Sequence, residues 1–291
     1  MILTIVSSVT VSNLRLDNQV FAHTFSGDES ATFLALLEMI KTEAHLAQQN
    51  LGTNVTLAQN HADATTEHLD ASQMKEISER NKRVANELND SLTAFKNAFN
   101  STSPPTASDI ADKVSNLEAI LGEVLSVRID NDQLNNATVK ALTINDLVGE
   151  TLEHYGEAVG HEESNATSES NNTDHHSNST SIEHSNSEAT HEVDANVTQG
   201  ANASSSSVQI INDAPYQTAQ ALSSRIVELF NDVKSSALNV TAAEDAQAGM
   251  ENLKSAIDKK VPFDTLDELI DSTISPNLNS AFNLKLKMEE G

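Results

Sequence analysis

Histidine is the side chain with which this sequence could build a chemical site. The chain contains 10 His and no Cys, which excludes disulfides, thiol catalysis and cysteine-ligated zinc. His61 and His68 are separated by two helical turns, so the spacing predicts that both lie on one face of a helix. With Glu43 or Glu67 they could ligate Zn²⁺ or Cu²⁺, for which imidazole and carboxylate are suitable ligands. The alternative is that these are polar side chains at the edge of a buried face.

A second group of histidines lies in residues 161–207, a segment dominated by Ser, Asn, Thr and Glu. Imidazoles among carboxylates on a flexible chain bind borderline metals weakly, because ordering the chain opposes binding. The alternative is a solvated polar spacer. The candidate metal ligands of the whole chain are His45, His61, His68, His175, His176, His184 and His191.

Catalytic motifs are missing from the sequence. A carboxylate-bridged di-metal bundle needs Glu-x-x-His on two helices, and the one instance runs from Glu188 to His191, inside the polar segment. There is no HExxH, no glycine-rich phosphate loop and no serine nucleophile elbow. We therefore predict that the protein is not an enzyme and needs no cofactor, with a bound Cu or Zn ion as the alternative.

Asn-X-Ser/Thr sequons occur along the whole chain, and several of them crowd into the polar segment, where exposure is expected. A single sequon is weak evidence, but together they favour a surface that is decorated with glycans. Three also stand between predicted helices, where an asparagine that caps the next helix is an equal alternative. The candidate glycosylation sites are Asn54, Asn89, Asn100, Asn136, Asn165, Asn171, Asn178, Asn196, Asn202 and Asn239.

Charge and the start of the chain bear on partners and location. The formal net charge is −26, and a field of this sign repels phosphate backbones, so no nucleic-acid partner is expected. Residues 1–11 are apolar and residues 20–22 resemble a cleavage site, so residues 1–23 read as a signal-like segment, although a basic start is missing. The alternative is a short strand or buried tail. We expect an extracellular, cell-surface or pseudo-periplasmic location.

The rest of the sequence predicts an all-α fold. Only 3% of residues are aromatic, and Gly and Pro are few, which suits narrow aliphatic helices better than β-sheets. Apolar residues recur every three or four positions from 31 to 50, from 77 to 99 and from 138 to 159. After the polar segment the pattern returns from Tyr216 to Val233, and shorter helices are expected around 266–273 and 278–286.

Helix starts are expected at hydroxyl side chains. Thr56 with Gln59, and Thr241 with Glu244, match the Thr-x-x-Glu/Gln capping box, and Ser108 is expected to cap a further helix. Replacement of Thr241 by alanine should therefore destabilise the protein.

An internal repeat indicates how the helices pair. Asn54-Val-Thr, Asn136-Ala-Thr and Asn239-Val-Thr each separate two helices with apolar stripes. The segments ending at Phe95 and Phe282 are also alike. The sequence therefore predicts a bundle of repeated helical hairpins. We expect helical regions at 24–160 and 208–291, packed on each other, and a long disordered linker at 161–207.

Residues 21–40 (FAHTFSGDESATFLALLEMI), followed by the Asn54-Val-Thr hairpin, resemble exported helical proteins of ammonia-oxidising (thaumarchaeal) archaea. The resemblance covers the helical parts and excludes the polar segment. It implies export, and it implies no particular activity.

These observations rank three functions. The first is a non-enzymatic extracytoplasmic protein for envelope structure, adhesion or partner binding. The second is an extracytoplasmic Cu or Zn buffer or delivery protein, which depends on the histidines. The third is an accessory or sensor domain that docks on a membrane protein.

Overall fold

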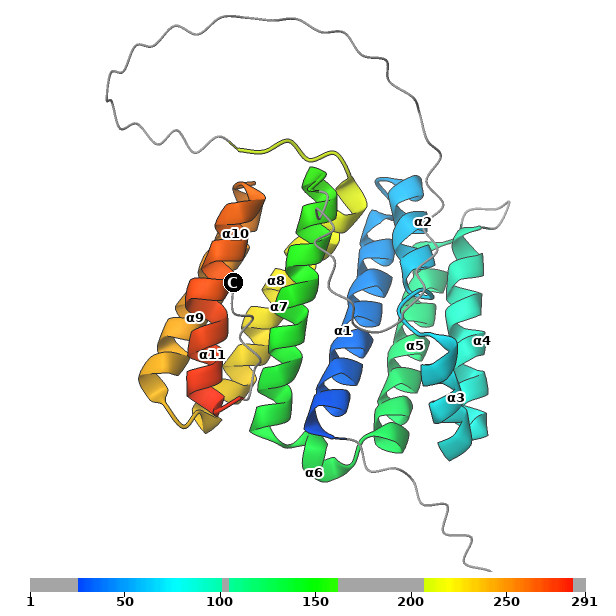
Figure 1. The fold of residues 1–291 in the computed structure, drawn as a ribbon. Helices are drawn as coiled ribbons and strands as arrows, with labels where there is room; N and C mark the ends of the chain where they lie inside the picture. The colour runs from blue at the N-terminus through cyan, green and yellow to red at the C-terminus, as the bar shows by residue number, and fades with distance from the viewer. Residues whose placement is uncertain (1–25, 101–104, 162–206, 285–291) are drawn as a thin grey trace, which may run out of the picture.

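The computed structural model describes residues 26–100, 105–161 and 207–284. Within these ranges the chain is all-α and contains no strand, which confirms the predicted fold class (Figure 1). No described helix is both long enough and apolar enough to cross a bilayer. The predicted signal-like segment and residues 162–206 of the predicted linker at 161–207 lie outside the described residues. So do His175, His176, His184 and His191 and the sequons from Asn165 to Asn202.

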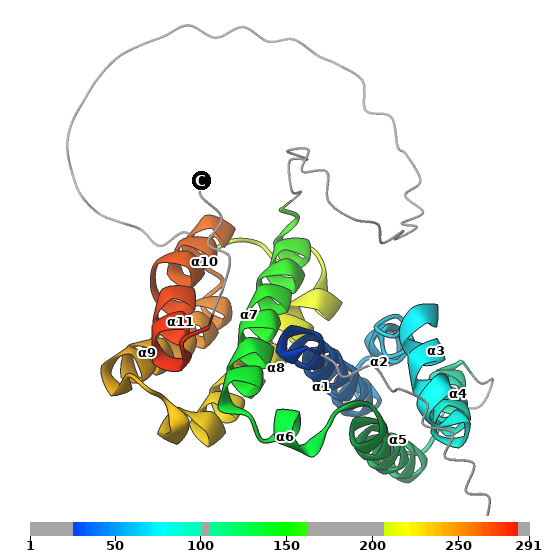
Figure 2. The same ribbon diagram turned by 60° about the horizontal axis from the view of Figure 1, so that its bottom comes forward.

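The helices pack side by side in an elongated array, with α1 and α7 near its middle (Figures 1 and 2). The short helix α6 links α5 to α7 at one end of α1 (Figure 1). The elements are α1 (Gly27–Asn50), α2 (Val55–Ala64), α3 (Ala71–Arg80), α4 (Lys82–Phe99), α5 (Ala107–Arg128), α6 (Asn131–Leu134), α7 (Ala137–Val159), α8 (Asp213–Val233), α9 (Val240–Asp258), α10 (Phe263–Leu269) and α11 (Ser275–Phe282), with a 3-10 turn at Lys234–Ser236 and a π-helical turn at Ile270–Ile274.

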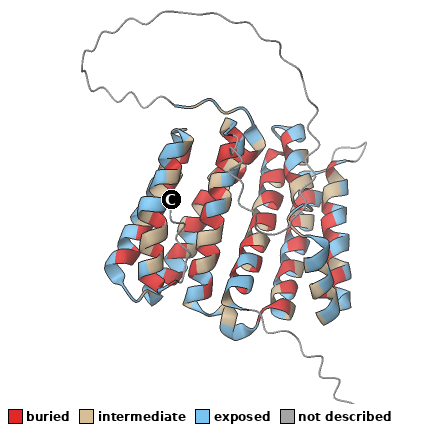
Figure 3. Ribbon diagram, in the orientation of Figure 1, coloured by how far each residue is buried: buried red, intermediate tan, exposed pale blue. Residues whose placement is uncertain are grey.

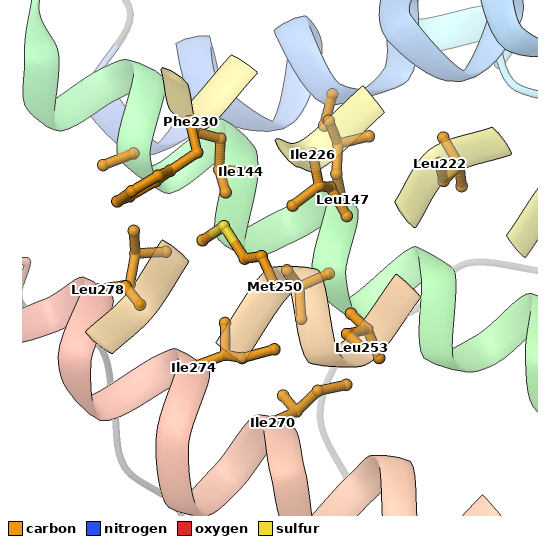
Figure 4. Close-up of a cluster of buried hydrophobic side chains, with 14 of the residues drawn as sticks. Ile144, Leu147, Leu222, Ile226, Phe230, Met250, Leu253, Ile270, Ile274 and Leu278 are labelled. Carbon is orange, nitrogen blue, oxygen red and sulfur yellow. The ribbon is translucent and has the colours of Figure 1, made fainter. Parts of the chain in front are cut away.

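Two apolar cores hold the array together, and α1 contributes to both. The first core is formed by α1–α5, and its rings Phe95 and Phe99 meet edge to face with centroids 5.3 Å apart. The second core is formed by α7–α11 together with α1, and Phe230 is one of its buried side chains (Figure 4). The Phe230 ring meets the Phe282 ring edge to face with centroids 6.2 Å apart. Phe95 and Phe282, which end the repeated segments, therefore lie in different cores.

Helix α1 can serve both cores because apolar residues occupy more than one of its faces. Phe33, Leu37 and Ile40 follow the expected stripe and face the first core. Ala35 and Met39 lie off that stripe and are buried in the second core. The red buried positions on both sides of α1 follow from this double burial (Figure 3).

Asparagine, not threonine, caps two of the repeated helices. The side chain of Asn54 accepts a hydrogen bond from the Leu57 N–H at 3.1 Å, and Asn239 accepts from the Ala242 N–H at 3.2 Å. Thr56 and Thr241 are the second residues of their helices and are exposed, so the capping boxes predicted there are wrong.

Helix α5 likewise begins earlier than expected. Thr106 caps it in a capping box with Asp109, whereas Ser108 lies inside the first turn. Asn136 caps α7 by accepting from the Thr138 N–H. The three repeated Asn-X-Thr sites therefore all serve as helix caps, which the extended backbone and short carboxamide of an N-cap asparagine explain.

A matched pair of variants tests which residue caps α9. Asn239→Ala should lower the free energy of unfolding by about 1 kcal/mol, because the Ala242 N–H loses its partner. Thr241→Ala should change it far less, since Thr241 makes no capping bond. Urea midpoints of the two variants decide this, and a larger loss in Thr241→Ala would contradict the cap.

The expected helix from 77 to 99 is divided at Asn81. This residue has an extended backbone (φ −152°, ψ 95°), ends α3 and caps α4 by accepting from the Val84 N–H at 3.3 Å. The apolar periodicity continues across the break, with Ile77 and Val84 in the same core, so periodicity alone could not reveal it.

Residues 263–282 form one continuous helical segment where two short helices were expected. Pro276 lacks the N–H that an α-helix needs there, and its ring would collide with the carbonyl four residues earlier. The π-turn at Ile270–Ile274 lies just before it and alters the local hydrogen-bond pattern. Gly249 of α9 allows this segment to approach closely, because an added Cβ would lie 2.9 Å from Ile274 Cγ1.

The two sides of the polar segment meet at one end of the molecule. The His161 ring stacks on Phe263 with centroids 3.8 Å apart. Val208 donates its N–H to the carbonyl of Lys260, and Ile211 donates to that of Ala158. Helices α7 and α8 are thus packed neighbours on either side of the segment (Figure 1).

Candidate functional site

A buried polar network joins α1, α2 and α8. Helix α1 supplies Glu43, α2 supplies His61, and α8 supplies Gln217 and Thr218. Glu43, His61 and Thr218 are each no more than 2% exposed. Buried charged and polar groups are tolerated only when they are bonded to one another, so their contacts define what the network can do.

The carboxylate of Glu43 is bonded on both oxygens. Its Oε2 lies 2.7 Å from His61 Nδ1, and its Oε1 accepts a hydrogen bond from the Thr218 hydroxyl at 2.7 Å. The single carboxylate of Glu43 therefore connects α1 directly to both α2 and α8. Thr218 is separated from it by 175 positions in the sequence.

The other side of the His61 ring reaches α8 as well. His61 Nε2 lies 3.1 Å from Gln217 Oε1. The same oxygen accepts from Asn50 Nδ2 at 2.6 Å, and Asn50 Nδ2 also donates to the Leu46 carbonyl at 2.9 Å. The result is a continuous chain of hydrogen bonds from the backbone of α1 through α8 and α2 back to α1.

Two further histidines lie around Glu43. Burial lowers the pKa of His68 to about 4, although the Glu43 carboxylate opposes this and His154 adds to it. Burial also acts to lower the pKa of His154, but Glu157, Glu43 and Glu150 outweigh it and the pKa is raised. His154 Nδ1 lies 3.7 Å from Glu157 Oε2.

The structure separates the histidines that the sequence grouped. Helix α2 ends at Ala64, so His68 lies in the turn after it and the predicted shared helix face is wrong. His68 comes near Glu43 through the packing of that turn. His45 is exposed on another side of α1, with Nε2 2.9 Å from Glu118 Oε1, and Glu67 is exposed.

Among the described residues, no three His, Asp or Glu side chains are grouped in a way that could hold a metal ion. His175, His176, His184 and His191 lie outside those residues. The arrangement that is present can form a buried ion pair and hold a proton between its members.

Glu43 and His61 could be selected from the sequence, but their partners Asn50, Gln217 and Thr218 could not. The sequence does carry one sign of a buried polar contact. Thr218 is a hydroxyl residue within the apolar pattern of α8, and Glu43 lies between Ile40 and Ala44. A polar residue in an apolar stripe indicates a buried partner without identifying it.

The depressed pKa of His68 predicts a loss of stability in acid. The unfolded chain binds a proton at the ordinary histidine pKa of 6.5, and the folded chain binds it only near pH 4. The contribution of His68 is therefore complete above pH 6.5 and is lost as the pH falls towards 4, by about 3 kcal/mol in all.

His68→Gln should remove this part of the pH dependence. We expect the free energy of unfolding of the variant to fall less than that of the native protein between pH 6.5 and 4. His45→Gln is the control, because His45 is exposed. Parallel curves for the native and His68→Gln proteins would show that His68 is not the group responsible.

Comparison with known proteins adds no relative: no family model, curated protein or solved structure matches this chain.

Proposed function

We propose that this chain is a non-enzymatic helical protein that acts outside the cytoplasmic membrane, in envelope structure, adhesion or the binding of a partner. The observation that carries the proposal is the buried Glu43–His61 network. Both oxygens of Glu43 and both nitrogens of His61 are engaged with other helices. Such bonding favours a role in joining helices over a role in transforming a substrate.

The surface supports the extracytoplasmic part of the proposal. Every sequon asparagine within the described residues is exposed, on helix caps, on the outer face of α4 or just after it. A glycosylating machinery acts on such exposed sites in exported proteins. The five exposed asparagines are Asn54, Asn89, Asn100, Asn136 and Asn239.

The cap geometry allows glycosylation and folding to be tested separately. At Asn54 the Oδ1 atom caps α2, whereas a glycan would be attached through Nδ2. Thr56→Ala removes the sequon and keeps the cap. Asn54→Asp removes the acceptor nitrogen and keeps a capping oxygen.

The deciding experiment is mass spectrometry of the protein purified from its native cells, with the two Asn54-site variants expressed in the same cells. We expect cleavage near residue 23 and added glycan mass on sequon peptides. The peptide that carries Asn54 should lose that mass in both variants, while their thermal midpoints stay close to the native value. A protein found only in the cytosol, uncleaved and without glycans, would refute the proposal. Cross-linking on intact cells then identifies the envelope partner.

A further inference from the structure

The direction of each hydrogen bond in the buried network can be assigned from one fixed group. The carbonyl of Leu46 is a backbone acceptor, so the Asn50 atom 2.9 Å from it must be the amide nitrogen. That nitrogen also lies 2.6 Å from Gln217, so the Gln217 atom facing it must be the acceptor oxygen Oε1. Reversing either amide would place two acceptors or two donors against each other.

The same Gln217 oxygen determines the state of the His61 ring. Gln217 Oε1 can only accept, so His61 Nε2, 3.1 Å away, must carry a proton. On the other side, Nδ1 lies 2.7 Å from the Glu43 carboxylate, and this contact also requires a proton between the two atoms. The pair therefore holds two protons, whereas a neutral imidazole beside an ionised carboxylate holds one.

We propose that Glu43 and His61 form a buried proton-binding site, and that the bound proton joins the α1–α2 hairpin to α8. The second proton lies either on His61 Nδ1, as an imidazolium–carboxylate pair, or on Glu43. In both cases the pair is neutral overall, and Thr218 donates to the remaining carboxylate oxygen. This proposal goes beyond the proposed function. It places a bound proton where a segment before the predicted linker contacts a segment after it.

The surrounding titratable groups do not provide this proton link. His68, in the turn after α2, has its pKa lowered to about 4 by burial and is neutral near pH 7. His154 of α7 is attracted to Glu43, but its ring is 3.7 Å from Glu157 and is also influenced by Glu150. On α8 the two contacting side chains, Gln217 and Thr218, carry no charge.

Loss of the proton has a defined structural consequence. If the remaining proton stays on Nδ1, the lone pair of Nε2 faces Gln217 Oε1. If it stays on Nε2, the lone pair of Nδ1 faces the Glu43 carboxylate. Either arrangement sets two acceptors against each other, at the part-buried contact with Gln217 or at the buried contact with Glu43, so the bond to α8 or the bond to α1 must break.

Nuclear magnetic resonance of the full chain at pH 7 tests the proton count. Ring nitrogens of labelled histidine report the protons on His61, and the carboxyl carbon of labelled glutamate reports the proton on Glu43. We expect two protons on the pair and a slowly exchanging Nε2–H. His61→Gln and Glu43→Gln assign the signals, and spectra of the native protein carry the test even if a variant does not fold. A single proton shared by the pair would overturn the proposal.

A second measurement tests the link to α8. The pH is raised until the His61 and Glu43 signals show loss of the second proton, and amide exchange is followed over the same range. We expect exchange at Gln217 and Thr218 to become faster by on the order of tenfold, beyond the intrinsic effect of pH, as the proton is lost. The amide of Leu92, in the first core, is the internal control. Unchanged protection of α8 after loss of the proton would refute the proposed coupling.

Discussion

Replacement of either Glu43 or His61 by leucine is expected to destabilise the protein by about 3–5 kcal/mol. Each residue is almost completely buried and bonded to the other at 2.7 Å. Removal of one partner leaves the other as a buried polar group with an empty bonding position. Thr218 or Gln217 on α8 loses its partner as well. Urea unfolding of each single variant at pH 7 measures the loss.

The double variant Glu43→Leu with His61→Leu should be less destabilised than the sum of the two single variants. Two leucines of similar volume leave no buried charge, and such replacements are often neutral or stabilising. The difference is the coupling energy of a double-mutant cycle. Losses that add without any coupling would show that the two side chains act independently, against the contact seen here. Gln49→Ala, at an exposed position of α1, is a control for general effects of substitution.

Phe95→Ala and Phe230→Ala are each expected to cost about 3–5 kcal/mol, because both rings are fully buried and alanine leaves a cavity. The two rings lie in different cores. Helix α1 contributes to both cores, and the Glu43 network connects it to α8. We therefore expect both variants to lower the midpoint of a single cooperative transition.

Calorimetry combined with urea unfolding distinguishes one transition from two. If the cores are independent, Phe95→Ala should lower only one of two transitions and leave the other at its native midpoint. Leu238→Ala is a suitable control, because Leu238 is 78% exposed and its loss should change stability little. Two separate transitions would contradict the coupling through α1.

Much of the helical organisation could be predicted from the sequence alone. The stripe Phe33, Leu37 and Ile40 lies in a core, and the helix expected at 138–159 is observed as Ala137–Val159. Helix signals of this kind are local, because the period of the helix itself places apolar residues on one face. Helix ends were predicted less well: Thr56, Ser108 and Thr241 resembled caps, but neighbouring residues with the extended backbone of an N-cap made the bonds.

In the candidate site, some residues could be predicted from the sequence and others could be found only in the structure. The sequence predicted His61 and His68 as metal ligands on one helix face, with Glu43 or Glu67 as a further ligand, but the helix ends before His68. The structure instead pairs His61 with Glu43. The sequence could not identify Gln217, because 156 positions and the whole polar segment separate that residue from His61.

Local pattern determined the all-α class, most of the helices and the acidic, sequon-rich character of this protein. Tertiary structure alone decided that α1 serves two cores and that α8 closes a hydrogen-bond chain around Glu43. The physical reason is that helix formation depends on residues three and four apart, whereas a buried polar group is satisfied by whichever donor or acceptor the packing brings to it.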